Sequence, residues 1–101
     1  RQFDGAPAAI EVLPVIADAI AGRVPVLFDS GIRGGLDILR ALSLGADFCF
    51  LGRAFLYAVA ALGSEGADHA YAILRQDVEN NMIQLGARSV IDLRGRAIPE
   101  R

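Results

Sequence analysis

The sequence predicts an α/β fold in which helices alternate with short parallel strands, and three observations support this. Two short, continuous apolar runs lie between segments of helical periodicity. Glycine-containing turns bound both runs, as is typical of strands buried on both faces of a parallel sheet. The order loop, helix, strand, helix, strand, helix, helix is the one expected of parallel α/β units. Because two strands make only a marginal sheet, we expect them to be the closing part of a larger barrel or sheet.

Composition favours a folded chain and excludes several functional classes. The chain has 101 residues, is 53% hydrophobic and carries a net charge of −2, which excludes disorder and argues against a nucleic-acid-binding surface. All ten basic residues are arginine, so a lysine Schiff base and a phosphate loop ending in Gly-Lys are both impossible. One cysteine and one histidine are too few for a zinc site or a disulfide framework.

The start of the chain suggests that it is a piece of a longer protein. It opens with Arg1 rather than Met and shows no signal-peptide pattern. The apolar run from Ala54 to Gly63 is half of the ~20 residues that a membrane-spanning helix needs. We therefore expect a cytoplasmic protein without a transmembrane segment, in which any association with a membrane would be through the missing part.

The first helix is predicted to begin near Pro7, after a loop at residues 1–6, and to end at Gly22. Pro14 removes one backbone donor in the middle of this helix and is expected to bend it. The apolar positions recur every three or four residues: Ile10, Leu13, Ile16, Ala17 and Ile20.

The two apolar runs, residues 24–28 and 46–51, are predicted to be the strands. A helix from about Leu36 to Leu44 connects them, with Asp37 in its first turn, where a carboxylate is favourable. Crossover connections of this kind join parallel strands.

Two further helices are predicted at residues 55–62 and 65–85, separated by a break at Gly63-Ser64. The longer one has an apolar stripe that Asp68, Arg75, Asp77 and Glu79 avoid, made of Ala67, Ala70, Tyr71, Leu74, Val78, Met82 and Leu85. Beyond it, the tail at residues 87–101 contains one apolar cluster and is expected to fray.

The strand ends carry the residues with functional chemistry. Residues 29–35 follow the first strand and Gly52-Arg53 follows the second, so parallel pairing puts them side by side at the carboxyl face. Glycines there let backbone N–H groups approach an anion, and the guanidinium groups of Arg33 and Arg53 match phosphate oxygens. These features predict a phosphate monoester ligand. The alternative is that the glycines only form turns and the arginines are solvated or paired with Asp29 and Asp47.

Three stretches of the sequence resemble the C-terminal segment of the FMN-dependent α-hydroxy-acid oxidases and dehydrogenases. They are Arg1-Gln2-Phe3-Asp4-Gly5-Ala6-Pro7-Ala8, Asp29-Ser30-Gly31-Ile32-Arg33-Gly34-Gly35-Leu36-Asp37 and Leu51-Gly52-Arg53, with Gly86-Ala87-Arg88-Ser89 matching the close of the last helix. The resemblance covers nearly the whole chain. It implies that residues 1–101 form the last two β/α units of a (β/α)8 TIM barrel that oxidises L-2-hydroxy acids such as glycolate, lactate or mandelate.

The resemblance also implies roles for individual residues. Arg1 corresponds to the arginine that binds the substrate carboxylate. Asp29 would hold the ribityl hydroxyls of FMN. The phosphate of FMN would be held by the backbone of Ser30 and Gly31 together with Arg33, Gly52 and Arg53.

The chain departs from the family in two ways. Position 30 is commonly Gly or Ala in the family and position 34 commonly Arg, whereas Ser30 and Gly34 stand here. The family's catalytic histidine lies just before the position of Arg1 and is therefore absent from this chain. We expect this chain to pair with the upstream segment of the same barrel and to bind a small 2-hydroxy acid. The resemblance also implies a homotetramer. No nucleic-acid partner is expected.

We predict structural roles for the remaining residues with reactive side chains, which are one histidine, one cysteine and two tyrosines. His69 is expected on the surface of the last helix, and Cys49 is expected to be a structural thiol in a buried strand. Tyr57 and Tyr71 fall on helical stripes and are expected to pack.

Two other functions are possible from the sequence alone. A different phosphate-binding barrel, of the IMP dehydrogenase or type 2 isopentenyl-diphosphate isomerase kind, shares a Gly-Ile-Arg loop at the same strand end, but the Arg-Gln-Phe-Asp-Gly start and Gly52-Arg53 argue against it. The other hypothesis is a non-catalytic half-barrel that binds another protein through its apolar faces.

Overall fold

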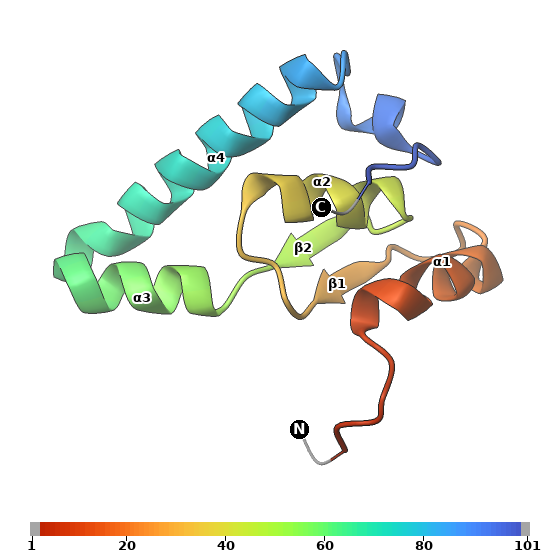
Figure 1. The fold of residues 1–101 in the computed structure, drawn as a ribbon, viewed down its shortest axis with the longest axis horizontal. Helices are drawn as coiled ribbons and strands as arrows, with labels where there is room; N and C mark the ends of the chain where they lie inside the picture. Colours follow the sequence, from red (N-terminus) through yellow and green to blue (C-terminus); the bar gives the residue numbers. More distant parts are fainter. Residues whose placement is uncertain (1–2, 100–101) are drawn as a thin grey trace.

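The predicted order of helices and strands is confirmed. The computed structural model describes residues 3–99 (Figure 1). Its helices and strands are α1 (Ala9–Ile20), β1 (Leu27–Asp29), α2 (Gly35–Ser43), β2 (Phe48–Phe50), α3 (Arg53–Leu62) and α4 (Gly66–Gln84), with 3-10 turns at Gly63–Glu65 and Val90–Leu93.

The two strands pair in parallel, as predicted. Leu27 lies opposite Phe48 and Asp29 lies opposite Phe50, and both arrows point the same way in Figure 1. Helix α2 makes the crossover between them. The carboxyl ends of β1 and β2 therefore lie next to each other.

Only one face of this sheet is covered within the described residues. Phe28 is 5% exposed and packs with the half-buried Cys49 against α1 and α2. On the other face, Leu27, Phe48 and Phe50 are 59%, 56% and 50% exposed. Burial on both faces is predicted for a larger barrel, whereas the helices among residues 3–99 cover only one face.

Helix α1 is fastened at both ends by local hydrogen bonds. The Glu11 carboxylate accepts the Ala8 N–H at 3.0 Å, which is half of a capping box. At the other end, Ala21 has a φ of 50° and Gly22 a φ of 73°, and the Arg23 guanidinium donates to the last carbonyls of the helix. The helix continues through Pro14 and contributes Leu13 to the core beneath the sheet.

Helices α3 and α4 form a hairpin whose close approach depends on Gly66. A Cβ at this position would lie 2.3 Å from the carbonyl oxygen of Ala58, a distance at which atoms overlap. Farther along, α4 packs on α2 through a second core cluster that includes Leu39, Val78 and Met82.

The C-terminal tail docks on the helices rather than fraying, so this expectation is wrong for residues up to 99. Leu93 is fully buried against α2 and α4. The Gly95 N–H donates to the Ser43 carbonyl at 3.0 Å, and the Arg40 guanidinium donates to the Pro99 carbonyl at 2.5 Å. The tail therefore runs back across α2 (Figure 1).

The surface is large for the size of the chain. The accessible area is 7282 Å², whereas a compact monomer of 10.7 kDa exposes about 5,500 Å². The excess reflects the open sheet face and the apolar side chains on the outside of α3 and α4. No helix among residues 3–99 is long and apolar enough to span a bilayer.

Candidate functional site

The two segments singled out from the sequence follow paired strand residues. Asp29 and Phe50 are register partners, so residues 30–34 and residues 51–52 leave the sheet at the same edge. The first segment leads into α2 and the second into α3 (Figure 1). This is the edge at which open and closed α/β sheets bind ligands.

The first segment turns sharply after β1. Ser30 has a φ of 112° and Gly31 a φ of 79°, a region that residues with a Cβ rarely occupy. The Asp29 carboxylate accepts the Ser30 N–H at 2.9 Å. Ile32 then inserts into the core at 6% exposure, so the Arg33 backbone starts from an anchored position.

The amides at the start of α2 are occupied by the protein's own carboxylates. Asp37 accepts the N–H groups of Arg33 and Gly34 at 3.0 and 3.1 Å. Asp77 of α4 accepts the Gly35 N–H at 2.6 Å. These three amides are therefore not open to an external anion, and of the loop's glycines only Gly31 has open space beside it.

The start of α3 is open by comparison. Gly52 precedes the helix, and no side chain caps it. The first hydrogen bond at this end runs from the Leu56 N–H to the Gly52 carbonyl at 3.0 Å, so the amides just before Leu56 have no partner inside the helix. Nothing lies within 4 Å of the position of a Gly52 Cβ. An anion can approach this end, where the helix dipole is favourable.

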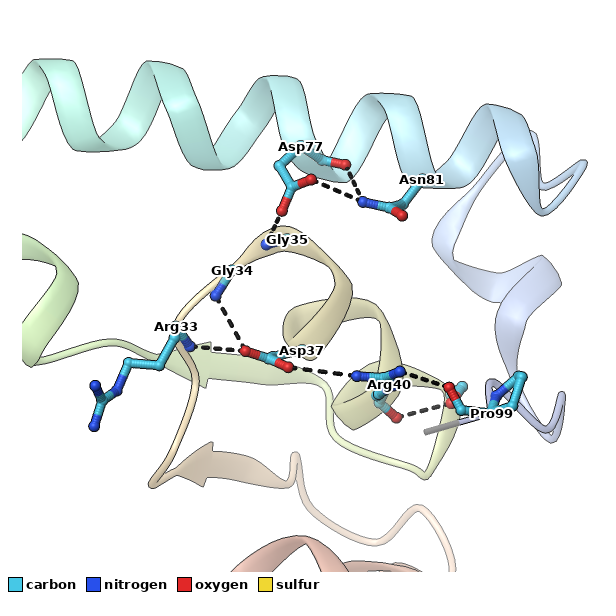
Figure 2. A network of polar contacts seen from close by, with 9 residues as sticks. Arg33, Gly34, Gly35, Asp37, Arg40, Asp77, Asn81 and Pro99 are labelled. Atoms are coloured by element: carbon cyan, nitrogen blue, oxygen red, sulfur yellow. Dashed lines mark hydrogen bonds and ion pairs between the residues drawn. The ribbon is translucent and has the colours of Figure 1, made fainter. Parts of the chain in front are cut away.

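The arginines of residues 3–99 divide into two groups. Most guanidinium groups donate to carbonyls or carboxylates within the chain: those of Arg23, Arg40, Arg75, Arg94 and Arg96. The guanidinium groups of Arg33, Arg53 and Arg88 make no hydrogen bond or ion pair with another described residue, and Figure 2 shows the Arg33 side chain pointing away from the network around Asp37. Asp47 pairs with Arg94, so the alternative pairing of Arg33 or Arg53 with Asp47 does not occur here.

A hollow of about 740 Å³ opens between the N-terminal segment and the loop after β1. Its walls include Phe3, Pro7, Ile10, Phe28, Ser30 and Gly31. The lining is largely apolar, and the polar loop at residues 30–31 borders it. The predicted carboxylate-binding residue Arg1 precedes this segment in the sequence but lies outside the described residues.

Four residues are predicted from the sequence to be structural rather than catalytic, and the structure shows how exposed each of them is. His69 is exposed on α4, as expected. Cys49 is half-buried, and desolvation raises the pKa of its thiol. Tyr57 and Tyr71 are 59% and 61% exposed, so the expectation that they pack is wrong within this chain.

Sequence reasoning missed the role of Asp77. It placed Asp77 among the residues that avoid the apolar stripe of the last helix, yet the side chain is half-buried and bonds to Gly35, 42 residues away. A bond over this separation leaves no local pattern. The one available signal was its position directly before Val78, which lies on the stripe.

Comparison with known proteins gives consistent matches over nearly the whole chain. The sequence pattern of the FMN-dependent dehydrogenase family matches residues 1–100. The L-lactate dehydrogenase of Xanthomonas campestris pv. campestris (strain B100) is 45% identical over 98 residues, which are 97% of this chain and 25% of that protein. The L-lactate dehydrogenase of Chromohalobacter salexigens is 43% identical over 93 residues, 92% of this chain and 24% of that protein.

Solved structures agree with these matches. A mandelate oxidase bound to benzoyl-formic acid superposes with a TM-score of 0.88 at 40% identity, covering 94% of this chain and 28% of that one. A flavocytochrome b2 variant with benzoylformate gives a TM-score of 0.84 at 40% identity, covering 93% and 25%. The chain thus spans about a quarter of the length of the curated relatives it matches.

Proposed function

Because the chain belongs to the FMN-dependent dehydrogenase family, we propose that it is the C-terminal part of an enzyme that oxidises L-2-hydroxy acids to 2-oxo acids. The substrate class is that of lactate, glycolate and mandelate. One observation supports this most: the guanidinium groups of Arg33 and Arg53, which have no partner among residues 3–99, follow neighbouring strand ends. In this chain the family's cofactor, FMN, would find its phosphate site there.

The architecture proposed for the complete protein is a (β/α)8 barrel in which β1 and β2 are the last two strands. Leu27, Phe48 and Phe50 would then point into the barrel interior, which in such barrels is filled by bulky side chains. Their exposure in this chain supports that placement. The free edges of β1 and β2 would pair with strands of the upstream segment.

The residues present fit the phosphate of FMN. Arg33 and Arg53 would bind its oxygens through their planar guanidinium groups. The open backbone at Gly31 and Gly52 leaves room for close approach, and the uncapped start of α3 would donate amides. The Ser30 N–H is held by Asp29, so Ser30 would contribute its hydroxyl more readily than its amide.

Asp29 and Arg1 would complete the contribution of this segment. One oxygen of Asp29 accepts the Ser30 N–H, and the other would hold a ribityl hydroxyl. Arg1 would bind the substrate carboxylate and orient the carbinol carbon. When bound, FMN supplies the two-electron chemistry, and the proton is taken by a base on the upstream segment. By the same resemblance, the complete protein would be a homotetramer.

Purification of the complete protein tests the proposal. We expect a yellow protein that contains one FMN per chain and oxidises L-lactate or L-mandelate. A colourless protein that FMN cannot reconstitute, or a flavoprotein inactive towards every 2-hydroxy acid, would contradict the assignment.

A further inference from the structure

Asp77 and Asn81 lie on the face of α4 that meets the start of α2. Asp77 Oδ2 accepts the Gly35 N–H at 2.6 Å. Asn81 Nδ2 donates to the other oxygen, Asp77 Oδ1, at 2.9 Å and to the Asp77 carbonyl at 2.7 Å. Both carboxylate oxygens therefore have partners, and Asn81 holds the side chain in the orientation that reaches Gly35 (Figure 2).

The backbones of α2 and α4 come close enough for this bond only because residue 35 is glycine. A Cβ at Gly35 would lie 2.5 Å from the Val78 nitrogen and 2.7 Å from the Asp77 carbonyl carbon. Gly35 is buried at this crossing. The contact is thus specific to one register of α4 against α2.

The Gly35 bond completes a row of restrained amides. Asp37 holds the N–H groups of Arg33 and Gly34 from within α2, and Asp77 holds the next amide from α4. On the other side, Ile32 is buried in the core. The Arg33 backbone is consequently fixed from both directions, while its guanidinium remains free to meet a ligand (Figure 2).

We propose that Asp77, oriented by Asn81, is a positioning residue for residues 33–35 of the loop after β1, so that α4 sets how well Arg33 binds the phosphate of FMN. This inference rests on the proposed function. A loop fixed before binding loses less conformational entropy when the phosphate binds. Within the described part of the chain, Asp77 bonds to backbone and to Asn81 only, so it acts through the loop.

Electrostatic repulsion alone predicts that removing Asp77 strengthens FMN binding, so the direction of the change in FMN affinity distinguishes the two effects. A carboxylate near an anion site repels the phosphate, so removing it would strengthen FMN binding if repulsion dominated. The positioning role instead requires that Asp77→Ala and Asp77→Asn both weaken FMN binding. Asn keeps an acceptor oxygen but loses the charge-assisted bond, so its effect should be the smaller.

The experiment titrates the complete apoprotein with FMN and with riboflavin, which lacks the phosphate. For Asp77→Ala we expect FMN affinity to fall about tenfold, in the range of one lost charge-assisted hydrogen bond, and riboflavin affinity to stay within about twofold. Asp77→Asn should lose about threefold for FMN only. In the Arg33→Ala background, Asp77→Ala should have little further effect, because both act on one contact.

Glu79→Gln is the matched control, since Glu79 lies on α4 and, among residues 3–99, pairs only with Arg75; FMN affinity should not change. Unchanged or tighter FMN binding in the Asp77 variants overturns the proposal, as does a parallel loss of FMN and riboflavin. If Asp77→Ala does not fold, Asn81→Ala decides in the same way. A wild-type protein that binds neither flavin would instead refute the proposed function.

Discussion

Asp47 joins two parts of the chain that are distant in sequence. One of its oxygens accepts the Val26 N–H at 2.8 Å, and the other pairs with the Arg94 guanidinium. These hydrogen bonds, that from Val26 first, lower the pKa of Asp47 below its ordinary value of 3.8. The charged carboxylate is therefore the form that stabilises the fold.

The lowered pKa predicts a pH-dependent effect of Asp47→Asn. The stabilisation that the charged Asp47 carboxylate gives to the fold should be complete above pH 3.8. It should be lost as the pH falls through the lowered pKa of this group in the folded state. Melting temperatures of the complete protein should thus show a clear deficit for Asp47→Asn at pH 6 that shrinks below about pH 4. A deficit of equal size at every pH, or one matched by Asp18→Asn on the exposed side of α1, would show that the charge has no such role.

The role proposed for Arg1 predicts a kinetic effect distinct from that of the loop arginines. Arg1→Lys keeps the charge but loses the planar pair of donors. We expect a higher KM and a lower kcat for the 2-hydroxy acid, with FMN content unchanged. Steady-state kinetics and flavin absorbance measure the two separately, and wild-type kinetics in this variant would remove Arg1 from substrate binding.

At the scale of helices, Gly66 decides how closely α3 and α4 approach. Helix propensity alone predicts that Gly66→Ala stabilises the protein by about 1 kcal/mol. The overlap with the Ala58 carbonyl predicts the reverse, a destabilisation of about 1 to 3 kcal/mol from overpacking. Urea unfolding of the complete protein gives the sign directly. A more stable variant would mean that the hairpin is looser than the structure has it.

The helices and the parallel strands could be predicted because their patterns are local. The apolar stripe of α4 and the turns at Gly22 and Gly63 are visible within a few residues. The docked tail could not be predicted in this way, since its anchors, Leu93 and the Arg40–Pro99 bond, depend on α2 lying nearby.

In the candidate site, too, some features follow from local sequence patterns and others depend on distant contacts. The adjacency of residues 29–35 and 52–53 follows from parallel pairing, which alternating periodicity predicts. The occupied amide at Gly35 depends on Asp77 from α4, and no pattern within the loop reveals this. The sequence therefore predicts an anion site at these strand ends, and the structure shows which backbone donors there are already occupied.

The whole molecule is more extended than a compact domain of its length. Its radius of gyration is 14.6 Å, against about 13 Å for a compact domain of 100 residues. The sheet face that no described helix covers exposes Leu27, Phe48 and Phe50 and contributes to the excess of accessible surface. Exposed apolar patches of this kind are typical of surfaces that bind another protein segment, a ligand or a membrane.

The proposed need for an upstream segment predicts the behaviour of residues 1–101 expressed alone. Two strands with one open apolar face should not be stable in water, so we expect self-association and rapid amide exchange in β1 and β2. Gel filtration and hydrogen exchange measure both properties. A stable monomer with protected strand amides would contradict the need for an upstream segment and favour an independent interaction module.

The most direct measurement compares FMN and riboflavin affinity in the complete apoprotein for Arg33→Ala, Arg53→Ala and the control Arg88→Ala. Arg88 also has no partner among residues 3–99 but lies beyond α4. If the strand ends hold the phosphate, each of the first two variants should lose about 1.5 to 3 kcal/mol of FMN binding. Riboflavin binding should be unchanged in all three, and Arg88→Ala should bind FMN like the wild type. FMN affinity that is undiminished in Arg33→Ala and Arg53→Ala, or that falls together with riboflavin affinity, would contradict a phosphate site at these strand ends.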